Sequence, residues 1–391
     1  MGRKKYAYIN PKMLAWARSE TPFKSTSDVE SHYPKITATA LDKWEKGEDY
    51  PSITEAKKLA AMYKLPFASF YLSEVPAKRV KRYTDRRTFN GTYTGEISYA
   101  LWCEIRRVES IRDSLVELSD GDALTKAIPL ITNDDTAAIA AAIREFLGLR
   151  TPLRTKSAYG ANPFNYYRDI IERCGIIVTQ VSGVEIEEMK GLSIFYDTFP
   201  IIAINNKDFD RSKVFSLFHE LAHIFRRSSS LCTIDLDEHS DQEEMICDRI
   251  AAEALMPETE FKKTASELNV RHHATDSIFV DLISGRFGVS TLSALRRMHE
   301  TGVITRKEFF DLLGTITEEY NANIARIEAQ RKGKNIPVYF HVKYINQNGS
   351  LLPKCVLNAC ATGRITYGEA CKTLGINTKH FTSIEQAVMF R

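Results

Sequence analysis

The sequence predicts a mostly helical α+β fold. Apolar residues recur at helical spacing along most of the 391 residues, and β-branched residues gather between 175 and 205. With 43% hydrophobic and 26% charged residues, the composition is that of a globular protein with more than one core. We expect four parts: an all-helical domain over 1–75, a basic linker and helical connection over 76–155, a domain with a small β-sheet over 156–330, and a small helical region over 331–391.

Composition also excludes several classes of protein. No run of eighteen apolar residues is present, and the first six residues are followed by no apolar segment of the kind that an export signal needs. The seven cysteines, odd in number and scattered, are typical of reduced thiols rather than of a disulfide framework. We therefore expect a soluble cytoplasmic protein with no membrane partner.

The first predicted domain is a series of short helices. Pro, Gly, Ser and Thr separate five of them, over 11–18, 27–32, 37–46, 54–63 and 67–72. Residues 76–87 hold Pro76 and six basic side chains, which indicates a linker. Beyond the linker, helical spacing returns over 95–118 and 134–148.

The third part contains both strands and helices. A helix over 163–173 precedes a β-branched strand over 175–181 and two apolar runs over 191–205, which predict a hairpin. Five further segments have helical periodicity: 211–226, 241–255, 276–286, 290–300 and 305–330. The pattern breaks near Pro337, and Val338–Phe340 fits either a short strand or an extended connection.

A metal-binding motif lies in the helix predicted over 211–226. His219-Glu220-Leu221-Ala222-His223 is an HExxH sequence, whose histidines are four residues apart and share one face of an amphipathic helix. Both imidazoles can therefore reach one ion. The Glu220 carboxylate beside them can take a proton from the attacking water and deliver it to the leaving amine. In the alternative interpretation the histidines are ordinary helix-face residues and Glu220 is solvated.

Zinc needs a third protein ligand, and the next predicted helix offers two carboxylates. We predict Glu244 as the ligand, with Glu243 as the fallback because it points about 100° away on that helix. Asp248 lies one turn after Glu244 and is expected to hydrogen-bond a ligating histidine. His239, in the connection between the helices, and Tyr196, on the hairpin, are weaker candidates for stabilising the transition state.

Three segments together are similar to the ImmA/IrrE family of zinc metallopeptidases. They are the run GLSIFYDTFPIIAINN from Gly191, the run RSKVFSLFHELAHIF from Arg211 and the run EMICDRIAAEALMP from Glu244. The chain has Cys247 and Asp248 where Ala-Asn is usual in that family, and residues 358–384 resemble the tail of its longer members. The resemblance implies a zincin-like fold and a gluzincin-like zinc endopeptidase that cleaves a repressor-type protein.

Residues 36–72 resemble the XRE-type helix-turn-helix of phage repressors, with Leu41 and Trp44 facing inward and Gly47 closing the helix. In such a module the second helix of the pair enters the major groove of duplex DNA. The resemblance implies five DNA-contacting candidates: Thr37, Thr39 and Lys43 toward the groove, and Lys35 and Lys46 toward phosphates.

Charge points in the same direction, because residues 1–90 carry 18 Lys and Arg against 10 Asp and Glu. Two other interpretations stay open: a solvated basic face with no partner, and a helical unit retained for protein contacts.

These observations favour one function over two others. The leading hypothesis is a zinc-dependent endopeptidase coupled to transcriptional regulation, which cleaves a repressor-type protein in a stress or mobile-element response. The alternative is a DNA-binding regulator or antitoxin-like protein whose peptidase domain acts as a sensor with little proteolysis. A purely structural zinc site is least favoured, because such sites usually have four Cys or His ligands.

Overall fold

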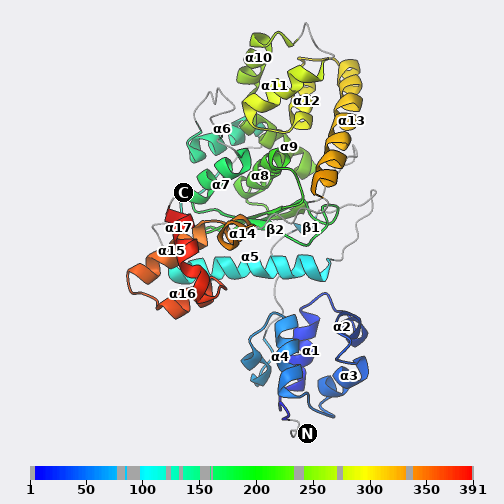
Figure 1. Cartoon of the computed structure of the whole chain (residues 1–391), viewed down its shortest axis with the longest axis vertical. Coiled ribbons are helices and arrows are strands. Elements are labelled where there is room, and N and C mark those ends of the chain that lie inside the picture. The colour runs from blue at the N-terminus through cyan, green and yellow to red at the C-terminus, as the bar shows by residue number, and fades with distance from the viewer. Residues whose placement is uncertain are drawn as a thin grey trace. The chain divides into compact units, whose positions relative to one another are not determined.

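The computed structural model describes residues 5–76, 84–85, 97–119, 125–131, 135–149, 159, 162–232, 242–270, 276–331 and 338–389. It divides into two compact units, Met1–Arg82 with Thr94–Arg107, and Tyr83–Tyr93 with Val108–Arg391. Helix α5 (Tyr99–Leu118) contributes to both. The predicted mostly helical α+β class is confirmed (Figure 1).

The first unit is built from short helices. They are α1 (Pro11–Ser19), α2 (Thr26–His32), α3 (Ala38–Lys46), α4 (Ile53–Met62) and the 3₁₀ turn η1 (Phe67–Tyr71). Ser25 and Ser52 form capping boxes at the starts of α2 and α4, and Gly47, at φ 78°, ends α3 in the left-handed conformation. Leu41 and Trp44 are buried, as their predicted inward orientation requires.

The sheet of the second unit is mixed. Its strands are β1 (Thr84–Asp85), β2 (Ile177–Val181), β3 (Gly191–Ile194), β4 (Ile201–Asn205) and β5 (Ser230–Cys232), in the order β1-β5-β3-β4-β2. The predicted hairpin is confirmed as the antiparallel pair β3–β4, and the predicted strand is β2, which pairs parallel to β4. Strands β5 and β1 were not predicted, and β1 lies in the expected linker.

Helices cover the central strands β3 and β4. Helix α8 (Asp210–Phe225) packs on both strands and on α9, and α6 and α7 extend the same layer (Figure 1). The other helices of this part are α6 (Thr136–Leu147), α7 (Pro163–Arg173), α9 (Gln242–Leu255), α10 (Glu258–Glu267), α11 (Ser277–Phe287), α12 (Thr291–Glu300) and α13 (Arg306–Arg331). Only α10 falls where no helix was predicted.

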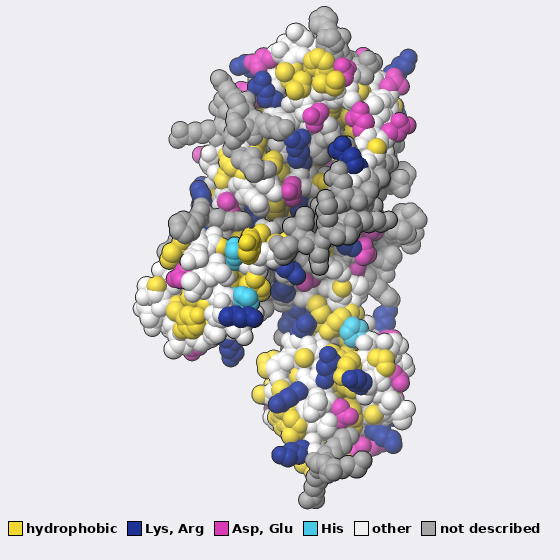
Figure 2. Space-filling view, viewed as in Figure 1, with side chains coloured by type: hydrophobic (Ala, Val, Ile, Leu, Met, Phe, Trp, Pro, Cys, Tyr) yellow, Lys and Arg dark blue, Asp and Glu magenta, His cyan; other side chains and the backbone are white. Residues whose placement is uncertain are grey.

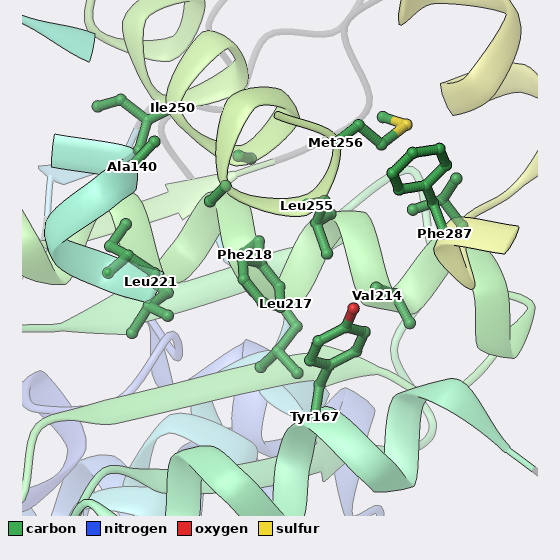
Figure 3. Packing of buried hydrophobic residues seen from close by; sticks show 14 of the residues in the cluster. Ala140, Tyr167, Val214, Leu217, Phe218, Leu221, Ile250, Leu255, Met256 and Phe287 are labelled. Carbon is green, nitrogen blue, oxygen red and sulfur yellow. The ribbon is translucent and has the colours of Figure 1, made fainter. Parts of the chain in front are cut away.

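The core that holds α8 in place is apolar and closely packed. Phe218 of α8 packs against Tyr167 of α7 with ring centroids 4.9 Å apart, and Leu217 and Leu221 of α8 and Leu255 of α9 belong to the same apolar cluster (Figure 3). All five are at most 3% exposed, so α8 is fixed along its length by the surrounding helices. The side chains on its remaining face are therefore held in fixed positions.

The last part of the chain is helical, as predicted. It contains α14 (Phe340–Asn348), α15 (Leu351–Ala361), α16 (Tyr367–Thr373), the 3₁₀ turn η4 (Thr378–His380) and α17 (Phe381–Met389). The expectation of a strand or extended connection at Val338–Phe340 is wrong at its last residue, because Phe340 begins α14. Helix α14 packs on β2, which places it at an edge of the sheet.

Two buried charged residues of α7 bind the last turn of α14 and the residue that precedes α15. Arg168 donates hydrogen bonds to the carbonyls of Ile345 and Asn346 at 2.6 and 3.0 Å. Glu172 accepts from the Ser350 amide at 3.1 Å and from its hydroxyl at 2.7 Å. These bonds fasten the C-terminal helices to the domain that carries the HExxH motif.

No single helix in the described part of the chain is both long and apolar enough to cross a bilayer, although the bent pair α11 and α12 satisfies the length and composition test when taken together.

Candidate metal centre

Helix α8 presents the three polar residues of the HExxH motif from a buried position. His219 is 8% exposed, and Glu220 and His223 are 1% and 0% exposed. The imidazole rings are one turn apart and come together at their Nε2 atoms, which lie 3.2 Å from each other. Such a pair of buried nitrogens, directed at one point, can hold a metal ion.

Helix α9 completes the cluster through Glu244. One carboxylate oxygen lies 3.0 Å from Nε2 of His219, and the other lies 3.2 Å from Nε2 of His223. Ser230, on β5, donates a weaker hydrogen bond to the same carboxylate at 3.4 Å. His219, His223 and Glu244 thus form a group that could bind a metal.

The Glu243 carboxylate is already bound by Arg226 and Ser228. Its carboxylate makes a two-pronged ion pair with Arg226 at 2.8 Å for both bonds, and it accepts a hydrogen bond from Ser228 at 3.2 Å. Glu243 also forms a second possible metal group with His223 and Cys247. Because Arg226 already neutralises Glu243, and burial raises the pKa of the Cys247 thiol far above its usual value, we favour the group that contains Glu244.

Each imidazole has a partner on its outer nitrogen. Nδ1 of His219 donates to Asp248 at 2.8 Å, where the sequence placed that carboxylate. Nδ1 of His223 lies 3.0 Å from the Ser228 hydroxyl, which in turn donates to Glu243. Such partners fix the orientation of a ligating ring. Ser228 was not predicted, because it follows the helix in a loop and no spacing rule points to it.

The charges of the cluster favour binding of a cation. Burial alone would raise the pKa of Glu244, but hydrogen bonds from His219 and His223 hold it well below its usual value. Burial would lower the pKa of His219, but the hydrogen bonds to Asp248 and then Glu244 raise it well above its usual value. A proton therefore occupies His219 readily where a metal would otherwise bind.

Glu220 lies beside this group in a different environment. Its side chain is buried, and burial raises the pKa of its carboxyl group. Among the described residues, its Oε2 atom has no hydrogen-bond partner. A buried carboxylate with a raised pKa, next to two imidazoles, has the properties of a general base.

Tyr196 and His239 are the two weaker candidates for stabilising the transition state. Tyr196 lies in the turn between β3 and β4, where the Arg112 guanidinium stacks over its ring at 3.6 Å from the centroid. Its part in transition-state stabilisation stays a prediction. His239 lies outside the described residues.

The five DNA-binding candidates, Lys35, Thr37, Thr39, Lys43 and Lys46, are all exposed on the first unit. The Thr37 hydroxyl caps α3 by accepting from the Ala40 amide at 3.2 Å, so it already has a structural use. Figure 2 shows Lys and Arg side chains over this unit interspersed with acidic and apolar ones. DNA binding by these residues stays a prediction.

Fold and site together are those of a metallopeptidase-like domain with a helical HExxH motif. Residues 176–299 match the family model of the IrrE N-terminal-like domain, Peptidase_M78. The chain therefore contains an M78 metallopeptidase domain, which includes β2–β5 and the metal cluster. Neither curated proteins nor solved structures gave a significant match. The matched segment does not include the N-terminal helices, so the predicted helix-turn-helix is untested.

Proposed function

We propose that this protein is a zinc-dependent endopeptidase. The observation that carries the proposal is the convergence of His219, His223 and Glu244: the two Nε2 atoms are 3.2 Å apart, and each lies 3.0–3.2 Å from a different oxygen of the Glu244 carboxylate. Ligand atoms about 2.0–2.1 Å from a tetrahedral ion lie roughly 3.3 Å from one another. Two nitrogens and one carboxylate oxygen are also the donor set of many catalytic zinc sites, which leave one position open. The residues present thus fit zinc.

The protein's own groups divide the chemistry between them. Zinc, when bound, supplies a Lewis acid that polarises the scissile carbonyl group. Glu220 accepts the proton of the attacking water and then donates it to the leaving amine. Asp248 and Ser228 hold the His219 and His223 rings in the orientation that binding requires.

The substrate class that we propose is a repressor-type DNA-binding protein. Support comes from the sequence resemblance and from the excess positive charge of residues 1–90, which in the sequence flanks the helices of the first unit at residues 3–5 and 78–87. In this proposal the first unit contacts duplex DNA or the repressor, and cleavage of the repressor relieves repression. Cytoplasmic location is part of the same proposal.

The experiment compares wild-type protein with Glu220→Gln against a set of repressor-type proteins encoded near its gene. Glu220 is a base and not a ligand, so the variant should keep its zinc and lose cleavage. Glu187→Gln, in an exposed loop of the same unit, is the control for removing a carboxylate and should cleave as the wild type does. Cleavage by Glu220→Gln would refute the proposal. Wild-type protein that holds zinc and cleaves none of these proteins would favour the sensor alternative.

A further inference from the structure

Strand β3 lies directly against the side chain of Glu220, at Gly191. A Cβ atom built on Gly191 would lie 2.1 Å from Oε1 of Glu220, 2.8 Å from its Cδ and 2.9 Å from its Cγ. Separations below 3.0 Å essentially do not occur for real Cβ atoms. The space that a side chain at position 191 would need is therefore filled by the Glu220 carboxylate.

The backbone of Gly191 does not require glycine. Its φ angle lies outside the left-handed region, unlike that of Gly183 or Gly288. Gly191 pairs in regular antiparallel register with Ile204 on one side and Cys232 on the other. An alanine could adopt this backbone conformation. The obstacle to alanine at position 191 is therefore the steric conflict with Glu220.

Glu220 has little freedom to move away. It is 1% exposed, and α8 is packed along its length by the sheet and the neighbouring helices. The next residue of β3 on the same face is Ser193, which is also fully buried. Burial has the larger effect on the pKa of the Glu220 carboxyl group and raises it, whereas the Ser193 hydroxyl interacts with that group and lowers its pKa. Both residues that follow this face of β3 therefore lie next to the Glu220 side chain.

We propose that Gly191 is a positioning residue for the general base: its missing side chain leaves the space in which the Glu220 carboxylate is held beside the metal group. The reaction step of this proposal rests on the proposed function, whereas the steric relation between the two residues does not. A methyl group at position 191 displaces the carboxylate and leaves His219, His223 and Glu244 in place. The variant therefore separates base placement from metal binding.

The activity test uses Gly191→Ala in the full-length protein. Zinc content and KM should stay close to wild type, and kcat should fall about 100-fold, because a displacement of about 1 Å at a reacting group can cost that much. Gly285→Ala, on α11, is the matched control, since no atom lies within 4 Å of its added Cβ. It should keep wild-type kcat. An unchanged kcat in Gly191→Ala would overturn the proposal, as would loss of zinc from that variant.

The stability test needs no peptidase activity, so it separates failure of this proposal from failure of the proposed function. Gly191→Ala should lower the thermal midpoint of the metal-free protein by roughly 2 to 8 °C, as overpacked cores do. In a Glu220→Ala background the space is free, and the same substitution should cause no further decrease. An equal decrease in both backgrounds would show that Glu220 does not occupy the space, and would overturn the proposal.

Discussion

Asp248 offers a direct test of how the metal group is held. Its carboxylate accepts a hydrogen bond from Nδ1 of His219 at 2.8 Å, and 53% of its side chain is exposed. Loss of a partner of this kind typically costs about 10 to 100-fold in metal affinity. Because water can reach the vacated position, we expect Asp248→Ala to weaken zinc binding by about 10-fold, the lower end of that range. Asp248→Asn can still accept the hydrogen bond and should bind zinc nearly as the wild type does.

The assay is a zinc titration against a competing chelator, with the wild-type protein and both variants measured side by side. Asp281→Ala serves as the control, because this exposed aspartate of the same unit contacts Arg211 and Ser284 instead of the metal group. Wild-type affinity in Asp248→Ala would refute the assigned role. Complete loss of zinc from both Asp248 variants would make Asp248 a direct ligand.

Three further predictions concern other parts of the chain. Glu172→Ala leaves the buried Arg168 without its carboxylate, so the free energy of unfolding should fall by about 3–5 kcal/mol in denaturant melts; an unchanged midpoint would contradict this. Full-length protein should bind duplex DNA less tightly as salt rises, and Lys43→Ala with Lys46→Ala should weaken binding further; salt-independent binding would exclude this contact. Because the pKa of His219 is raised above the ordinary histidine value of about 6.5, protons begin to compete with zinc at a pH above that value, and zinc affinity should fall as pH falls. A zinc affinity that does not depend on pH would contradict this prediction.

Periodicity was sufficient where a helix buries a full face. The segments predicted over 163–173, 211–226 and 241–255 all form helices within one or two residues of the expected bounds. Helix α10 was missed because it is mostly polar, with two buried residues. Strands β1 and β5 were missed because strands of two and three residues show no pattern of their own. Their pairing depends on neighbours far away in the sequence.

The candidate metal site, like the fold, could be predicted only in part from the sequence. The i, i+4 spacing is enough to bring His219 and His223 together, and the acidic start of the next helix was enough to nominate Glu244. Arg226 decides which of the two adjacent glutamates is available, and no spacing rule indicates that ion pair. No sequence rule indicates Gly191, because its role depends on how β3 packs against α8.

Metal content tests the central claim most directly. Elemental analysis of the purified full-length protein should give about one zinc per chain, because one set of two histidines and one glutamate forms the group. His223→Ala should lose that zinc while remaining folded. Zinc-free wild-type protein after zinc loading, or stoichiometric zinc in His223→Ala, would contradict the assignment of His219, His223 and Glu244 as the metal ligands.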